Sequence, residues 1–319
     1  YWGIIQRVVG AIAWLLRKFM NISGAEGLVS AGNIFMGMTE APVMIKHYLP
    51  TMTKSELFLV MVTGMGTIAG TVMGSYISLL GGTDPAQKVL FATHLFSASI
   101  MAVPGSIVMA KMICPQTESV HDLPDTQTDM RQAKSLLEAI ANGTATGVKL
   151  MTNIAAMLLV FISLVALANY FTEGLIGRYT GLNDWIVEVT DGKATGLTFQ
   201  FLLGVVTAPF MWLIGVPSSD IMLVGSLLGQ KTILNEFVAY FQLQQWKEAG
   251  LFLFDKSIIM STYILCGFAN ISSIGILLGG LGVLAPEKKD LIARLGVPAM
   301  IGGALVSLLS ATLIGMIID

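Results

Sequence analysis

Charged residues are scarce in this sequence. Only 12% of the 319 residues are Asp, Glu, Lys or Arg, while 54% are hydrophobic. An average soluble domain has about 25% charged residues, so this composition indicates an integral membrane protein. The 18 basic and 20 acidic residues give a net charge of −2. No basic surface is expected to follow a phosphate backbone, and we expect no nucleic-acid partner.

Cysteine and histidine are also rare. Cys114 and Cys266 are far apart in apolar surroundings, which gives neither a disulfide framework nor a CxxC motif, so we expect two packing cysteines. The three histidines are isolated from one another, and no metal-binding cluster can be drawn from them. No Ser or Cys is paired with a His in a way that suggests a nucleophile, so we predict no catalytic residues and a protein that is not an enzyme.

Two apolar stretches nevertheless contain a glutamate. Residues 30–42 read SAGNIFMGMTEAP and include Glu40, and residues 229–240 read GQKTILNEFVAY and include Glu236. A carboxylate at bilayer depth costs roughly 2.5–3.5 kcal/mol, so such a residue usually faces a cavity, a partner or an ion. We therefore expect the two glutamates to meet at one water-lined pocket near the middle of the bilayer.

Helix-breaking residues interrupt several of the apolar segments. Broken backbone at membrane depth is tolerated only where protein buries it or where it lines a wet cavity. Residues 28–48 are interrupted by Gly and Pro and predict a re-entrant helical hairpin, and residues 57–80 predict a discontinuous helix. Elsewhere the pattern predicts an interfacial helix at 1–20, a membrane-spanning helix with a Pro kink at 89–113, a polar loop at 114–131, a clean span at 148–170 and a polar segment at 171–196.

The second half of the chain repeats the order of the first. Trp14-Leu15 precedes Glu40 much as Trp212-Leu213 precedes Glu236. Each glutamate is followed by an apolar helix interrupted by glycine and polar residues (a notched helix), and then by a helix that contains Pro. Repeats of paired interrupted segments are typical of secondary transporters with a site near the midplane. The sequence thus predicts an all-α integral membrane protein with two inverted repeats, re-entrant helical hairpins and discontinuous transmembrane helices.

Several motifs, in order, resemble the concentrative nucleoside transporter family in its sodium-coupled, bacterial-type form. They are GMTEAP at 37–42, TKSEL at 53–57, GTIAG at 66–70, the G-x-K-x3-N-E-F-V-A-Y run at 229–240 and CGFAN at 266–270. The resemblance covers essentially the whole chain. It implies a homotrimer in the cell (inner or plasma) membrane that takes up nucleosides by sodium symport through alternating access. Because family members carry about three helices before this point, we expect the chain to begin part-way into a longer protein.

The resemblance also implies a division into domains. The transport domain would comprise hairpin 1 with the first discontinuous helix at 25–82, and an interfacial segment, hairpin 2 and the second discontinuous helix at 197–285. The remaining parts are the end of a scaffold helix with an interfacial helix at 1–24, a transmembrane helix at 83–113, a polar loop with the long scaffold or trimerisation helix and its connector at 114–196, and the last transmembrane helix at 286–319.

By the same resemblance, eight residues bind the nucleoside. Glu236, Asn270 and Ser273 would bind the ribose hydroxyls, with Phe268 packing near the sugar or base; the base-facing residues would be Met38, Thr39, Glu40 and Val72. A ribose needs carboxylate and amide partners, which agrees with the first group. From the residues alone, Asn270 and Ser273 could equally serve as hydrogen-bonding contacts between helices. Many relatives have Gln at the position of Met38, so we hypothesise that Met38 relaxes base selectivity or favours purines.

The implied coupling ion is sodium. Its ligands would be the side-chain carbonyl of Asn33, the backbone carbonyls of Met36 and Ile68, and the hydroxyl of Thr67, with the backbone oxygen of Thr67 as a possible further ligand. From the residues alone, Asn33 and Thr67 could also be capping residues. Proton coupling through a glutamate stays an alternative, because desolvation raises the pKa of a carboxyl group. An intramembrane hydrolase and a passive channel are the alternatives from other classes. Lys231 is expected to be a solvated charge, or else to snorkel or balance Glu236.

Overall fold

The computed structural model describes residues 4–119, 135–190, 192 and 194–318. This part of the chain is mostly helical, and none of its residues lies in a β-strand, which confirms the predicted all-α class. Among these described residues, three stretches are long and apolar enough to cross a membrane, judged by length and composition: Lys54–Gly81, Pro85–Ile113 and Pro286–Ile317.

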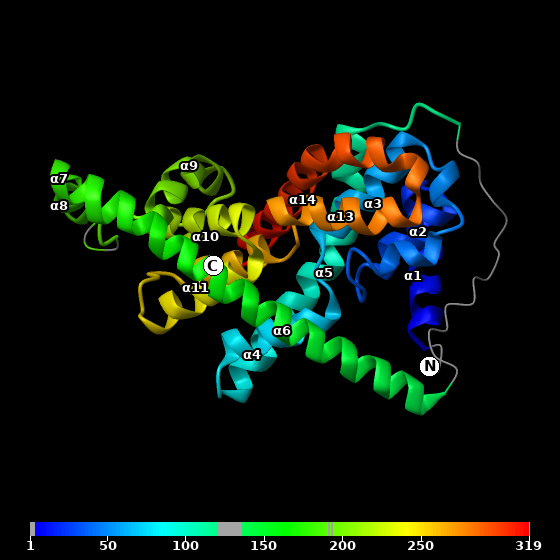
Figure 1. The fold of residues 1–319 in the computed structure, drawn as a ribbon, viewed down its shortest axis with the longest axis horizontal. Helices are drawn as coiled ribbons and strands as arrows, with labels where there is room; N and C mark the ends of the chain where they lie inside the picture. The colour runs from blue at the N-terminus through cyan, green and yellow to red at the C-terminus, as the bar shows by residue number, and fades with distance from the viewer. Residues whose placement is uncertain (1–3, 120–134, 191, 193, 319) are drawn as a thin grey trace. The chain divides into compact units, whose positions relative to one another are not determined.

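The helices follow one another along the chain with short connections (Figure 1). The α-helices are α1 (Ile4–Met20), α2 (Gly24–Gly32), α3 (Lys54–Gly66), α4 (Gly70–Gly81), α5 (Pro85–Ile113), α6 (Leu136–Asn169), α7 (Arg178–Thr180), α8 (Leu182–Val189), α9 (Phe199–Leu213), α10 (Ile221–Ile233), α11 (Glu236–Glu248), α12 (Asp255–Leu265), α13 (Ile271–Leu284) and α14 (Lys289–Ile317). The 3-10 helices are η1 (Ala41–Ile45), η2 (Leu49–Thr51), η4 (Ser218–Asp220) and η5 (Pro286–Lys288), and η3 (Tyr170–Gly177) is a π-helix.

The chain divides into two compact units. Unit 1 consists of Tyr1–Ser75, Leu95–Met151 and Cys266–Ser310, and unit 2 consists of Tyr76–His94, Thr152–Leu265 and Ala311–Asp319.

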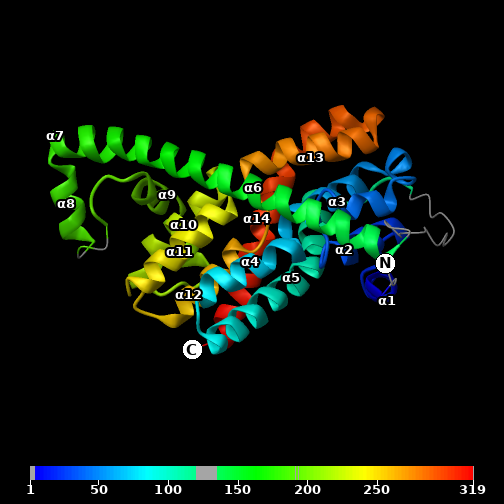
Figure 2. The ribbon, with the colours of Figure 1, turned by 60° about the horizontal axis from the view of Figure 1, so that its bottom comes forward.

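In unit 1, α1 and α2 form an antiparallel pair that lies together in Figure 1 and Figure 2. Ser23 and Glu26 form a capping box, which fixes a new helix start three residues after α1 ends. A Cβ added at Gly27 would lie 3.1 Å from the carbonyl oxygen of Ala13, so the small residue permits the close approach. The helical pair is therefore α1–α2, not a hairpin within 28–48. The glycines and proline of that segment instead mark the end of α2 and the 3-10 turns that follow.

The centre of unit 1 is α3, in which every residue from Ser55 to Gly66 is buried. A helix that is apolar on all sides is expected to be surrounded by other elements. The helix ends at Gly66 and resumes as α4 at Gly70, so the predicted discontinuous helix is confirmed, with its interruption at residues 67–69. Lys54–Gly81 would be one continuous span without this break.

In unit 2, α9 and α10 form a second antiparallel pair, and α11 and α12 pack beside α10 (Figure 2). Glycines allow this close approach. A Cβ at Gly204 would lie 2.8 Å from the carbonyl oxygen of Met222, and one at Gly225 would lie 2.7 Å from Oγ1 of Thr207. Close packing at small residues is the usual way in which helices associate in membranes. The glutamate of each half thus follows the second helix of an antiparallel pair.

The middle of the chain departs from the sequence prediction in extent. The span predicted at 148–170 lies in α6, which begins earlier, at Leu136, because the amphipathic connector continues the same helix. The polar segment predicted at 171–196 contains η3, α7 and α8 rather than an irregular connector. Residues 120–134 of the predicted polar loop lie outside the described residues.

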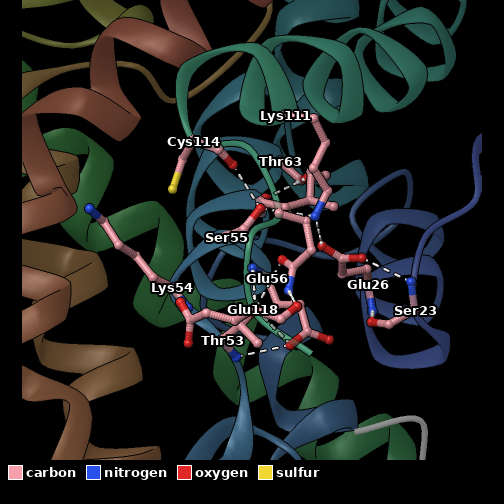
Figure 3. A network of polar contacts seen from close by, with 12 residues as sticks. Ser23, Glu26, Thr53, Lys54, Ser55, Glu56, Thr63, Lys111, Cys114 and Glu118 are labelled. Atoms are coloured by element: carbon pink, nitrogen blue, oxygen red, sulfur yellow. Dashed lines mark hydrogen bonds and ion pairs between the residues drawn. The ribbon is translucent and has the colours of Figure 1, made fainter. Parts of the chain in front are cut away.

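A polar network in unit 1 joins the beginnings of α2 and α3 to the end of α5 (Figure 3). Nζ of Lys111 donates to Glu26 Oε1 at 2.5 Å and to Ser55 Oγ at 3.1 Å, and Ser55 Oγ donates to the carbonyl oxygen of Cys114 at 2.7 Å. Thr53 and Glu56 form a second capping box beside it. Glu26 is only 2% exposed, so the lysine neutralises a charge that water cannot reach.

We predict that Lys111→Met destabilises the protein. Removing one member of a buried ion pair costs roughly 3–5 kcal/mol. Lys111 is 26% exposed, and solvent screening lowers the expectation to about 2 kcal/mol. Thermal unfolding in detergent measures the loss, with the exposed Lys54→Met as the control. Adding Glu26→Gln to Lys111→Met should restore part of the stability because no charge is then left alone. A Lys111→Met melting temperature equal to that of the wild type would contradict the role given to this pair.

Candidate functional site

Two helix breaks meet inside unit 1. Gly267, in the break between α12 and α13, has φ +136, and a Cβ there would lie 2.9 Å from the carbonyl oxygen of Met65 and 3.0 Å from that of Gly66. A backbone with positive φ and no space for a side chain requires glycine. The second break is therefore packed against the end of α3, where the first break begins.

The predicted cation ligands lie at this first break. Gly70 N donates to the carbonyl oxygen of Phe35 at 3.1 Å, which brings residues 33–36 beside residues 67–70. Asn33, the C-cap of α2, is fully buried, and neither its Oδ1 nor its Nδ2 has a hydrogen-bond partner. A buried polar group without a partner costs about 1–3 kcal/mol, so a ligand that satisfies Oδ1 would be bound favourably here.

Thr67 contributes a second oxygen to the same place. Its hydroxyl donates to the carbonyl oxygen of Thr63 at 2.8 Å, so the lone pairs of Oγ1 remain to accept. Thr67 and Ile68 are buried, and Met36 is half-buried. Neutral oxygen ligands suit a hard cation of low charge, and the residues present fit the predicted ion.

Met38 and Thr39 follow Asn33 closely in the chain and lie against two other helices of unit 1. A Cβ at Gly64 would lie 2.9 Å from the Cβ of Met38, and a Cβ at Gly280 would lie 3.2 Å from Cγ2 of Thr39. Met38 is thus buried between α3 and its neighbours, whereas Thr39 and Glu40 are exposed. Glu40 Oε2 accepts a hydrogen bond from Gly37 N at 3.3 Å, which holds the carboxylate over the turn.

Asn270 and Ser273 form the start of α13. Asn270 is the N-cap, and its Oδ1 accepts from Ser273 N at 2.9 Å and from Ser273 Oγ at 3.0 Å. Both residues are buried, Phe268 beside them is half-buried, and Val72 on α4 is buried. The sequence did not predict Asn270 as a helix cap, and this cap fixes the orientation of the amide.

Glu236 is the first residue of α11 in unit 2. Asn235 caps this helix through a bond from Val238 N at 2.9 Å, so the Glu236 carboxylate lies at the positive end of the helix dipole. Tyr76 OH donates to Glu236 Oε1 at 3.1 Å, and its ring is stacked on Tyr240 with centroids 4.3 Å apart. A hydrogen bond, a stacked ring and a helix terminus together hold this nearly buried carboxylate in place.

The predicted residues divide unevenly between the units. All of them except Glu236 belong to unit 1, where the contacts above join the cation ligands to Met38 and to the break before Asn270. The meeting of Glu40 with Glu236 stays a prediction. The sequence interpretation did not anticipate Tyr76, and the only signal for it was its position one turn after Val72 on the notched helix.

Lys231 corrects another expectation. It is fully buried, and its Nζ donates to the carbonyl oxygen of Ile264 at 2.8 Å. The interpretation as a solvated charge is therefore wrong. Ile264 lies in the last turn of α12, where carbonyl groups lack helical partners and a cation is favourable. Gln230, the residue before Lys231 on α10, is also buried, and its Nε2 has no hydrogen-bond partner.

Three features are typical of membrane transport proteins with discontinuous helices. They are broken helices, helix starts next to carboxylate and amide side chains, and buried neutral oxygens beside a break. Comparison with known proteins identifies the family. Residues 94–315 match the family described as Na+ dependent nucleoside transporter C-terminus, and residues 1–83 match one described as nucleoside recognition. The chain belongs to the sodium-dependent nucleoside transporters, a family of transporters rather than enzymes.

Relatives and solved structures agree with this placement. The chain is 38% identical to an uncharacterized transporter of Haemophilus influenzae, over 100% of this chain and 72% of that protein. It is 38% identical to sodium/nucleoside cotransporter 2 of Rattus norvegicus, over 99% of this chain but 47% of that protein, so it spans about half the length of this mammalian relative. A structure of CNTnw in an inward-facing substrate-bound state has a TM-score of 0.82 and 35% identity, covering 98% of this chain and 70% of that one. A CNTnw variant in an outward-facing state has a TM-score of 0.85 and 34% identity, with the same coverage.

We predict that Tyr76→Phe lowers thermal stability more than Tyr240→Phe does. Both tyrosines are fully buried and stacked on each other, and each loses a hydroxyl that donates one bond. Tyr76 donates to a carboxylate, a bond worth about 1.5–3 kcal/mol, whereas Tyr240 donates to the carbonyl oxygen of Thr262, worth about 0.5–1.5 kcal/mol. Melting temperatures in detergent compare the two. Equal losses would show that Glu236 does not depend on Tyr76.

Proposed function

We propose that the protein is a secondary active transporter that takes nucleosides into the cell by symport with sodium. The observation on which this rests is Asn33, a fully buried amide without a partner at the meeting of two helix breaks, in a chain of the sodium-dependent nucleoside transporter family. Relatives named sodium/nucleoside cotransporters support the cation and the substrate. Solved CNTnw structures in outward-facing, intermediate and inward-facing states support transport by alternating access.

Sodium would bind between residues 33–36 and residues 67–70. Asn33 Oδ1, Thr67 Oγ1 and the backbone oxygens of Met36 and Ile68 are the proposed ligands. The unpartnered Oδ1 of Asn33 and the Thr67 hydroxyl, which donates one bond and can still accept, support this assignment. All four ligands are neutral, so the ion is held weakly enough to be released on each transport cycle.

The nucleoside would bind beside the cation. Asn270, Ser273 and Glu236 are the proposed ribose partners, and Phe268, Val72, Met38, Thr39 and Glu40 the residues around the base and sugar. The packing of Met38 against Gly64 and of Thr39 against Gly280 supports a position for this turn between α3 and α13. Glu236 is held as a hydrogen-bond acceptor by Tyr76 and the start of α11.

The architecture proposed for this function has two inverted repeats. Each has an antiparallel helical pair (α1–α2, α9–α10), a glutamate and a broken helix (α3–α4, α12–α13), which supports the repeat and a re-entrant placement of the pairs. Residues 25–82 and 197–285, together with α1 as the partner of α2, would form the mobile transport domain, with α6 in a static scaffold. We propose a homotrimer in the inner or plasma membrane. The many exposed apolar side chains of α6 support this proposal, because they could pack against the neighbouring subunits.

Replacing sodium by choline at fixed pH tests the coupling. We predict that uptake of radiolabelled nucleoside into vesicles falls at least tenfold in choline, and that Asn33→Ala raises the sodium concentration for half-maximal uptake at least threefold, because one ion ligand is lost. Undiminished uptake in choline would reject sodium coupling in favour of protons. Label that never exceeds the outside concentration would indicate a passive channel, and chemically altered label a hydrolase.

A substitution at Met38 tests the placement of the base. We predict that Met38→Gln raises pyrimidine uptake relative to purine uptake about threefold or more, because the amide adds two donors and a strong acceptor that a thioether lacks. Competition by a panel of nucleosides against one labelled substrate measures the preference. Met38→Leu, which keeps the volume without adding polar atoms, is the control. An unchanged preference in Met38→Gln would place Met38 away from the base.

A further inference from the structure

Two serines near the proposed cation site share an unusual property with Asn33. Ser30 and Ser106 are fully buried, and neither hydroxyl has a hydrogen-bond partner. Among the described residues of unit 1, Ser30, Asn33 and Ser106 contribute all of the buried side-chain nitrogen and oxygen atoms that lack a partner. Each such group costs free energy unless a ligand or a water molecule satisfies it.

Two hydrogen bonds connect residues 26–34 with α5. Lys111 donates to Glu26, and Ser99 Oγ donates to the carbonyl oxygen of Ile34 at 3.4 Å, so the two segments run in opposite directions between these contacts. In sequence, Ser30 lies between Glu26 and Ile34, and Ser106 lies between Ser99 and Lys111.

Ser106 also lies next to the first helix break. A Cβ added at Gly66 would lie 2.9 Å from Ser106 Oγ. Gly66 is the last residue of α3 and the immediate neighbour of Thr67, and Ser30 is one helical turn before Asn33. Each unpartnered hydroxyl thus lies close to a proposed sodium ligand. Ser30 on α2 is one turn from Asn33, and Ser106 on α5 is next to Gly66, the residue before Thr67.

The proposed site has fewer ligands than a hard cation usually takes. Ca2+, which is close to Na+ in size, takes about six to eight oxygen ligands, often including water. The proposed protein ligands are four, from Asn33, Met36, Thr67 and Ile68. A water molecule on the ion needs two to four polar partners of its own, and the serine hydroxyls are polar groups that lack partners.

We infer that Ser30 and Ser106 are positioning residues for the coupling cation: their hydroxyls hold a water molecule that completes the coordination shell of the ion. The inference rests on the proposed sodium symport and adds α5 to the elements that bind the ion. It also predicts opposite effects on the ion-free and ion-bound protein. In the ion-free protein, removing an unpartnered hydroxyl removes a buried polar group that costs free energy. In the ion-bound protein, the same change removes a hydrogen-bond partner of the water molecule on the ion.

Thermal unfolding of the purified full chain in detergent, titrated with sodium chloride against choline chloride at constant ionic strength, tests this inference. For Ser106→Ala we expect a melting temperature in choline equal to or above that of the wild type, and a sodium concentration for half-maximal stabilisation about three- to tenfold higher. Ser30→Ala should behave in the same way. Ser106→Cys keeps the shape but replaces a hard oxygen by a soft sulfur, so it should resemble the alanine variant. Half-saturation by nucleoside at saturating sodium should not change.

Ser261→Ala is the matched control, because Ser261 is also fully buried but its hydroxyl bonds the carbonyl oxygen of Ser257 within α12. It should lower the melting temperature equally in sodium and in choline. A wild-type sodium half-point in Ser106→Ala and Ser30→Ala would overturn the inference and leave the sodium site itself in place. A wild-type protein stabilised by nucleoside but not by sodium would reject the sodium coupling, and the inference with it.

Discussion

The contact between two helix breaks is the constraint on which the site depends. The ends of broken helices present backbone carbonyls and amides that an apolar surrounding cannot satisfy, so they must be paired with each other or with a ligand. Gly267 meets Gly66 so closely that neither break could shift alone, and Gly70 N is tied to Phe35 O. These contacts keep the interruption of α3–α4, the segment after α2 and the start of α13 in one place within unit 1.

The two helix ends that precede the breaks are treated differently. The end of α12 receives a fixed cation, because the buried ammonium of Lys231 donates to Ile264 O. At the end of α3 the nearby side chains are neutral, with Thr67 bonded to Thr63 O and Asn33 without a partner. Under the proposed symport, the end of α12 carries the permanent charge of Lys231, whereas the end of α3 binds a sodium ion that can exchange. A lysine cannot leave its carbonyl, whereas an ion bound by neutral oxygens can dissociate, which a coupling ion must do on every cycle.

The sequence predicted the broken helices well because glycine, asparagine and threonine within apolar runs have a direct physical meaning. It placed the first antiparallel pair wrongly because the polar residues of α1 suggested an interfacial helix, while the capping box at Ser23 is a short local signal. The bond from Lys231 to Ile264 connects residues that are 33 positions apart in the chain, and the bond from Tyr76 to Glu236 connects residues that are 160 positions apart. No local pattern reports such contacts, which depend on tertiary packing, whereas the candidate residues came from motifs that the family shares.

The arrangement in unit 1 suggests how the two substrates are coupled. A ligand can favour one conformation only through a difference in affinity between states, and coupling between two ligands requires a shared element. Residues 33–39 are such an element: the proposed ion ligands Asn33 and Met36 are followed within three residues by Met38 and Thr39, which contact Gly64 and Gly280. An ion that draws residues 33–36 toward 67–70 would also fix the turn at Met38. The entropy of ordering that turn is then lost on ion binding, so a nucleoside that binds afterwards binds more tightly.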